Sequence, residues 1–146
     1  MPAIQEDVHI HAPAGEVFAR LADTQAYGDW LPRAFRDVRA DGDGFVCVLA
    51  LPGRGELVRL APSLIEEPRV LQFEASNGAR GLDQLTFILS AEGAREVHLV
   101  ADAAYTASGG FIGILLDGVL HRHFRRQALR DALWRLKQLA EGAARA

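Results

Sequence analysis

The sequence predicts an α+β fold in which a curved antiparallel sheet of seven strands wraps around one long C-terminal helix. Apolar residues alternate or run continuously through most of residues 35–106, as in strands. Short segments rich in glycine and proline interrupt them, and such short connections favour antiparallel neighbours because a parallel crossover needs about a dozen residues. Residues 110–141 contain no proline and carry an apolar stripe at helical spacing. A sheet packed on this stripe is the layer arrangement that fits.

The first 32 residues predict one strand and two short helices. Apolar and polar residues alternate over 4–10, which is typical of a strand with one buried face. Pro13 suits the first turn of a helix that ends by Asp23. A second short helix ends at Pro32 and carries three apolar residues at i, i+3 and i+4: Tyr27, Trp30 and Leu31. We interpret its aromatic residues as a lid over the sheet.

The remaining elements follow from turn residues and apolar periodicity. Six more strands are expected, at about 35–40, 44–51, 56–66, 69–75, 82–90 and 95–106. The long helix is expected over about 110–141, and Glu141-Gly142 ends it. On a helical wheel its apolar stripe contains Phe111, Leu115, Val119, Leu129, Leu133 and Leu136.

Composition limits the protein class and its partners. With 146 residues, 49% hydrophobic and 24% charged, the chain predicts one globular domain over 1–146 and excludes disordered and collagen-like classes. The formal charge of −3 provides no global attraction for nucleic acid, which we do not expect as a partner. No apolar stretch approaches the roughly 20 residues of a membrane span.

The cysteine content and the N-terminus favour a cytoplasmic location. Cys47 is the single cysteine, so an internal disulfide is excluded and a thiol-reducing compartment is expected. Residues 1–11 carry acids and histidines and lack the pattern of a signal peptide. Fifteen of the 16 basic residues are arginine, which indicates a GC-rich bacterial genome.

Three segments carry a resemblance to a known superfamily. They are residues 10–18 (IHAPAGEVF), residues 27–32 (YGDWLP) and residues 128–137 with Glu141. In these segments and in element order the whole chain resembles the SRPBCC superfamily, the helix-grip fold of START lipid-transfer domains, polyketide aromatase/cyclases and the birch-pollen allergen. The segment at 30–32 is similar to cyclase/dehydrase-like and ubiquinone-binding members. The resemblance implies a deep, mostly apolar cavity between sheet and long helix.

We expect this cavity to bind a small hydrophobic molecule, such as a lipid, a quinone or a polyketide-like aromatic. Affinity would come from apolar area removed from water, and a few polar groups would orient the ligand. Plain core packing is the alternative for such apolar faces. The candidate binding residues are Trp30, Phe45, Phe73, Phe87, Leu99, Tyr105, Phe111, Leu115, Val119 and Arg122.

Two arginines and one tyrosine are the polar candidates. Arg122 and Arg126 fall within the apolar stripe, where an unpaired guanidinium would be very costly. Each must reach water, pair with a carboxylate, or meet an anionic group of a ligand. Tyr105 could offer its phenol to a ligand carbonyl, or it could be a satisfied core tyrosine.

We expect neither a metal nor a cofactor. His121 and His123 point apart on a helix, and His9 and His11 share a strand face without a Cys or carboxylate motif beside them in the sequence. Residues 109–113 are rich in glycine but lack the dinucleotide-binding fingerprint. No serine-hydrolase elbow occurs, and Cys47 is expected to be an inert core thiol.

Two other functions stay open. In a polyketide cyclase/dehydrase-type enzyme, Tyr105 or Arg122 would stabilise an enolate, although no convergent acid–base pair is evident and the catalytic residues are unassigned. In a protein-interaction module, the basic helix would be the contact, since residues 121–137 carry six basic residues against one acidic residue. A solvated helix face is the simpler interpretation of that charge.

Overall fold

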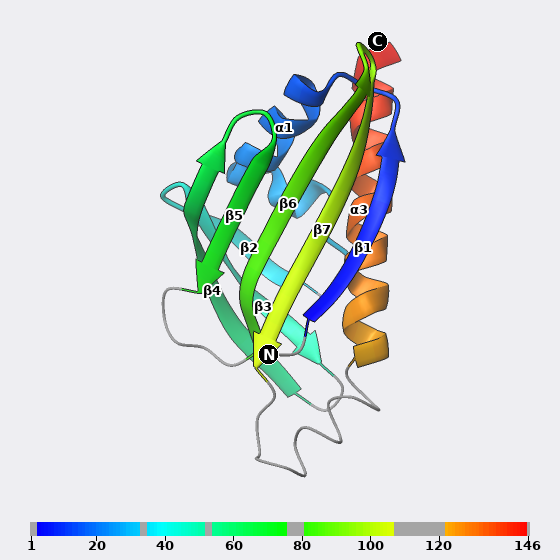
Figure 1. Cartoon of the computed structure of the whole chain (residues 1–146). Helices are drawn as coiled ribbons and strands as arrows, with labels where there is room; N and C mark the ends of the chain where they lie inside the picture. Colours follow the sequence, from blue (N-terminus) through cyan, green and yellow to red (C-terminus); the bar gives the residue numbers. More distant parts are fainter. Residues whose placement is uncertain (1–2, 33–34, 52–53, 76–80, 107–121, 146) are drawn as a thin grey trace.

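A curled antiparallel sheet of seven strands, in the order β1-β7-β6-β5-β4-β3-β2, forms the larger part of the structure (Figure 1). The computed structural model describes residues 3–32, 35–51, 54–75, 81–106 and 122–145. The strands are β1 (Ala3–Ile10), β2 (Phe35–Asp41), β3 (Gly44–Leu51), β4 (Arg54–Glu66), β5 (Val70–Ala75), β6 (Gly81–Gly93) and β7 (Glu96–Thr106). All seven expected strands are present, and their bounds lie within two residues of the predicted ones, except that β6 ends three residues later than expected.

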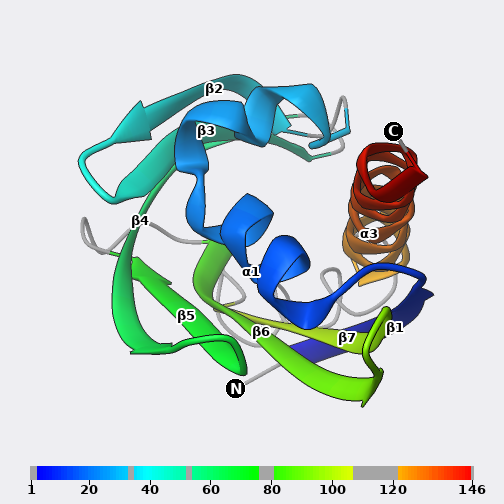
Figure 2. The same ribbon diagram turned by 90° about the horizontal axis from the view of Figure 1, so that it is seen from above.

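Three helices accompany the sheet in the described part of the chain. They are α1 (Ala14–Ala22), the 3₁₀ helix η1 (Thr24–Asp29) and α3 (Arg122–Arg145). Seen from above, the sheet curves around α1, while η1 lies along β2 and α3 runs beside β1 (Figure 2). None of these helices is long and apolar enough to cross a membrane.

Strand alternation places apolar side chains on the inner face of the curve. On β5, Leu71 and Phe73 are buried and Glu74 is exposed. On the outer face Gln72 Nε2 donates to Thr86 Oγ1 at 3.0 Å across the β5–β6 pair. Alternate residues of β6 and β7 are buried in the same way: Leu85, Phe87, Leu89, Val97, Leu99, Ala101 and Ala103.

Irregularities in the strand register accompany the curvature of the sheet. The register shifts between Arg36 and Arg39 in β2 and between Pro62 and Leu64 in β4, and similar shifts occur in the β6–β7 pair. Such bulges bend a strand and increase its local twist. At the β2–β3 turn, Gly42 has a φ of +61°, which glycine adopts without steric penalty.

The C-terminal helix packs through the stripe that the sequence predicts. Leu129, Leu133 and Leu136 are buried in the common core. Burying each of these leucine side chains contributes about 1.5–3 kcal/mol to the stability of the folded chain. The expected stripe residues Phe111, Leu115 and Val119 lie outside the described residues.

The second short helix differs from its prediction in type and position. It is a 3₁₀ helix that ends before Trp30, and Tyr27 and Trp30 are 0% and 3% exposed. Their rings are part of the core, and the interpretation of these residues as a lid stays a prediction. The i, i+3 spacing predicts that Tyr27 and Trp30 share one face, and the structure confirms this, with both rings pointing inward.

Candidate functional site

A cluster of four aromatic rings lies on the inner side of the sheet. Tyr27 is in η1, Trp30 follows that helix, Phe45 is on β3 and Phe73 is on β5. The Tyr27 ring centroid lies 4.8 Å from those of Trp30 and Phe45, and Phe45 lies 5.4 Å from Phe73. These tilted and edge-to-face contacts are the favourable arrangements for aromatic pairs. We call these four residues the aromatic wall.

Tyr27 contacts the three other rings of the aromatic wall, and its hydroxyl is hydrogen-bonded to the backbone. The Tyr27 hydroxyl donates a hydrogen bond to the carbonyl oxygen of Leu21, the penultimate residue of α1. Burial raises the pKa of the Tyr27 phenol, and the nearby negative charge of Asp23 raises it further. The phenol is therefore a neutral donor that ties η1 to α1, and it is not a proton shuttle.

Trp30 brings a polar atom into this apolar environment. Its residue is 3% exposed, and Nε1 is a buried side-chain donor without a hydrogen-bond partner in the described part of the chain. Buried donors are normally satisfied, and each unsatisfied one costs about 1–3 kcal/mol. The indole N–H can thus donate to an acceptor that enters the interior.

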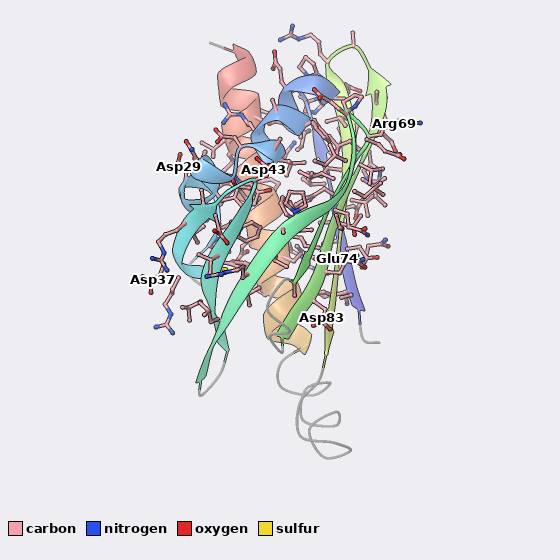
Figure 3. The ribbon with its side chains drawn as sticks, turned by 90° about the vertical axis from the view of Figure 1, so that its left-hand side faces the viewer. Asp29, Asp37, Asp43, Arg69, Glu74 and Asp83 are labelled. Atoms are coloured by element: carbon pink, nitrogen blue, oxygen red, sulfur yellow. The ribbon has the colours of Figure 1, made fainter. Side chains whose placement is uncertain are left out.

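Asp37 and Glu74 lie on the outside of the sheet, whereas Glu6 lies between β1 and α3. Asp37 and Glu74 are exposed and point away from the interior (Figure 3). On α3, Arg126 Nε and Arg130 Nη2 each lie 3.1 Å from Oε1 of Glu6 on β1. Of the alternatives left open for Arg126, pairing with a carboxylate is the one observed. The basic face of α3 is accordingly neutralised in part within the chain.

A cluster of histidine and glutamate side chains lies at a place that the sequence did not indicate. Nδ1 of His9 lies 3.1 Å from Oε1 of Glu92, and Nδ1 of His11 lies 3.4 Å from Oε1 of Glu96. The statement that these histidines have no carboxylate beside them holds for the sequence but is wrong for the structure. Glu92, near the end of β6, and Glu96, at the start of β7, supply the carboxylates because β7 pairs with both β6 and β1.

Comparison with known protein families shows to which family the chain belongs. Residues 1–141 match the family model described as polyketide cyclase / dehydrase and lipid transport. The chain belongs to this family. The resemblance to the SRPBCC superfamily and the helix-grip fold is thereby confirmed, together with the seven-stranded antiparallel sheet and its C-terminal helix.

Solved structures support the same fold for this member of the cyclase/dehydrase and lipid-transport family. It is similar to TTHA0849 from Thermus thermophilus, with a TM-score of 0.80 at 15% identity, over 98% of this chain and 99% of that one. It is also similar to a START superfamily protein from Mycobacterium smegmatis, with a TM-score of 0.62 at 13% identity, over 98% and 97% of the two chains.

An enzyme of known class has the same fold. The Zhui aromatase/cyclase from Streptomyces gives a TM-score of 0.62 at 18% identity, over 96% of this chain and 93% of that one. At identities this low, the structural similarity establishes the fold of the family member and leaves its ligand open. The sequence has no significant match among curated proteins.

Five of the ten predicted binding residues are placed by the structure. All five belong to the buried core of this family member: Trp30, Phe45, Phe73, Phe87 and Leu99. Phe111, Leu115 and Val119 lie outside the described residues, and the side chains of Tyr105 and Arg122 are not described. The interpretation of these ten residues as a binding site stays a prediction.

Sequence reasoning missed Tyr27 as a site residue and interpreted Cys47 correctly as a core residue. Tyr27 touches all three other members of the aromatic wall, and its i, i+3 spacing to Trp30 was the available signal.

Cys47 is buried on β3, and burial raises the pKa of its thiol to about 12. A thiol in this state is a poor nucleophile.

Proposed function

We propose that this protein binds a small hydrophobic molecule, such as a lipid, a quinone or a polyketide-like aromatic, in the interior between the sheet and the C-terminal helix. The observation that carries the proposal is the buried Trp30 Nε1 of the aromatic wall, which has no hydrogen-bond partner among the described residues, in a chain of a cyclase/dehydrase and lipid-transport family. A core built for packing alone would gain by satisfying this donor or by replacing it with an apolar side chain.

The chemistry of the aromatic wall suits a planar or aliphatic guest with an oxygen acceptor. Phenylalanine rings and the indole face provide apolar contact area, and the favourable free energy scales with the apolar area removed from water. The Trp30 N–H would donate to one ligand oxygen and so fix the orientation of the guest. Quinones, fatty acids and polyketide-like aromatics all carry such an oxygen.

The two tryptophans of the chain allow a direct test. Trp30 is buried, whereas Trp134 on α3 is 55% exposed. In the variant Trp134→Phe, Trp30 is the sole indole, and its emission is titrated with decylubiquinone, oleate and anthraquinone-2-carboxylate. We expect a saturable change in Trp30 emission with at least one of these probes. The reciprocal variant Trp30→Phe reports from Trp134 and should show no saturable change with that probe.

Two results would count against the proposal. One is an unchanged Trp30 emission with all three probes, combined with native mass spectra in which the purified protein carries no apolar mass. The other is an equal response from Trp134 in Trp30→Phe, which would locate probe binding at the surface of α3.

Catalysis of the cyclase/dehydrase kind is the second candidate, and the family description favours it. Tyr27 and Cys47, two ionisable side chains of the described core, have raised pKa values through burial and do not form an acid–base pair near neutral pH. Any catalytic group would have to come from residues such as Tyr105 or Arg122. Turnover of a model polyketide that is lost in Tyr105→Phe would support the enzyme.

The third candidate, an interaction module using the basic helix, has less support. Arg126 and Arg130 share Glu6, and Lys137 lies 2.5 Å from Oε2 of Glu141. Three basic groups of the helix are thus engaged within the chain. Salt-sensitive binding of an acidic partner, lost in Arg125→Glu/Arg130→Glu, would favour this candidate.

A further inference from the structure

Histidine and glutamate side chains gather where three distant parts of the chain meet. The end of β1, the turn between β6 and β7 and the C-terminal part of α3 lie side by side at one end of the molecule (Figure 1). His9 and His11 come from β1 and the residue after its end, and Glu96 comes from the start of β7. We call His9, His11 and Glu96 the His–Glu cluster.

The donor atoms of the His–Glu cluster converge. One ligand atom from each residue can be chosen so that all three lie within 4.8 Å of one another. Nε2 of His9 lies 3.7 Å from Oε2 of Glu96, and Nδ1 of His11 lies 3.4 Å from Oε1 of the same carboxylate. Zinc bonds of about 2.0–2.2 Å in a tetrahedron separate neighbouring ligand atoms by about 3.3–3.6 Å. The two spacings from nitrogen to carboxylate are close to this separation, each to a different oxygen of Glu96.

A fourth side chain sets the orientation of His9. Oε1 of Glu92 lies 3.1 Å from Nδ1 of His9, within hydrogen-bonding distance. A carboxylate that accepts from Nδ1–H leaves the lone pair on Nε2, the nitrogen that faces Glu96. Metal-binding histidines commonly donate their second N–H to a carboxylate in this way, which fixes the tautomer and raises ligand basicity.

The backbone of both histidines is held from α3. Lys137 Nζ donates to the carbonyl oxygen of His9 at 2.6 Å, and the N–H of His11 donates to Oε2 of Glu141 at 2.9 Å. The strand end that carries the two imidazoles is therefore fixed by the folded chain. The side chains of the His–Glu cluster keep 41–60% exposure, so an ion can reach them from solvent.

We propose that the His–Glu cluster is a binding site for a divalent transition metal, with Zn²⁺ as the first choice. Two imidazole nitrogens and one carboxylate oxygen form a donor set typical of Zn²⁺, with the fourth position open to water. Glu92 acts on the ion through His9 as a positioning residue. Bound metal would tie β1 to the β6–β7 turn and stabilise the folded chain, since the unfolded chain does not hold these residues together.

The experiment uses the full chain, stripped of metal with a chelator and titrated with Zn²⁺ by calorimetry and thermal unfolding at neutral pH. We expect one equivalent to bind and the Tm to rise in a way that EDTA reverses. The substitutions His11→Gln and Glu96→Gln should each abolish the Tm shift. Glu92→Gln should weaken affinity by about 10–100-fold, the range seen when a partner of a ligating histidine is lost.

His98 provides a matched control on the same sheet. It is a partly exposed histidine opposite His9 in the β1–β7 pair, and its Nε2 lies 2.7 Å from Asp7. His98→Gln should leave Zn²⁺ binding unchanged. The proposal is overturned by the absence of a Zn²⁺-dependent Tm shift, or by an equal loss in His98→Gln and His11→Gln, which would indicate adventitious binding to surface histidines. The outcome does not depend on whether the interior binds a hydrophobic guest.

Discussion

The backbone N–H of His11 donates a hydrogen bond of 2.9 Å to Oε2 of Glu141, a residue 130 positions later in the chain. The same oxygen accepts from Lys137 Nζ at 2.5 Å, and Lys137 in turn reaches the carbonyl oxygen of His9. The Glu141 side chain is only 11% exposed. This carboxylate therefore links the residue after β1 to the C-terminal part of α3.

Replacing Glu141 by Gln should destabilise the protein by about 1.5–3 kcal/mol at neutral pH, the range for a hydrogen bond to a charged group. Urea unfolding of the parent protein and the variant measures this loss in the free energy of unfolding. Glu74→Gln, on the exposed face of β5, is the control and should stay within about 0.5 kcal/mol of the parent protein.

The destabilisation by Glu141→Gln should depend on pH in a defined direction. Burial acts to raise the pKa of the Glu141 carboxyl, but the His11 N–H and Lys137 outweigh it, so the pKa lies below its usual 4.5. A lowered folded-state pKa gives stability that is complete above 4.5 and lost as the pH falls through the folded-state value. The difference between parent and variant should therefore shrink in acid. A constant difference down to about pH 2 would contradict this assignment.

Glu6 serves two arginines of α3, and its removal should have a small effect that depends on salt. The Glu6 side chain is 14% exposed, whereas those of Arg126 and Arg130 are 48% and 60% exposed. Exposed ion pairs contribute about 0.2–1 kcal/mol, and added salt screens them. Unfolding of Glu6→Gln at low and at high ionic strength should show a loss of stability that decreases with salt. Equal losses at both ionic strengths would show that Glu6 acts through packing instead.

Cys47 should resist thiol reagents as long as the protein is folded. Burial raises its pKa to about 12, so the thiolate is scarce at pH 8. Because the chain has one cysteine, labelling by a chromogenic disulfide reagent reports this residue alone. We expect slow labelling in buffer and fast labelling in denaturant. Fast labelling of the folded protein would show that the inner face of β3 is open to solvent.

The local parts of this fold follow from the sequence and the long-range contacts do not. The inward positions of Phe73 and Leu99 follow from period-2 alternation, because neighbouring side chains on a strand point to opposite faces. The carboxylate partner of Arg126 lies on β1, 120 positions away, and only the packing of α3 on β1 makes them neighbours.

The His–Glu cluster illustrates the same limit. His9 and His11 share a face by alternation, but Glu96 reaches them because β7 pairs with β1 and the register shifts near the β6–β7 turn. Neither the pairing nor the shift has a signature in the spacing of the histidines. The same holds for the aromatic wall, since the contacts of Tyr27 with Phe45 on β3 and Phe73 on β5 have no signature in the spacing of the sequence.

The Tyr27 hydroxyl gives a prediction that separates the contribution of its hydrogen bond from that of its ring. Tyr27→Phe keeps the ring contacts with Trp30 and Phe45 but leaves the Leu21 carbonyl without its donor. The expected loss is about 1–2 kcal/mol, against about 3–5 kcal/mol for Tyr27→Ala, which removes the ring as well. Equal losses in the two variants, measured by urea unfolding, would show that the ring contributes nothing beyond the hydroxyl.

Alkaline titration tests the state of the same hydroxyl. The chain has two tyrosines, so Tyr105→Phe leaves Tyr27 as the only phenol that absorbs near 295 nm on ionisation. Because burial and then Asp23 raise the pKa of Tyr27 above its usual 10.0, the folded protein keeps a proton that the unfolded chain releases. The contribution of the protonated Tyr27 phenol to the free energy of unfolding is therefore complete below pH 10 and declines as the pH rises further. Phenolate should appear together with unfolding, and phenolate absorbance that rises near pH 10 in a protein with native circular dichroism would refute the buried hydrogen bond to Leu21.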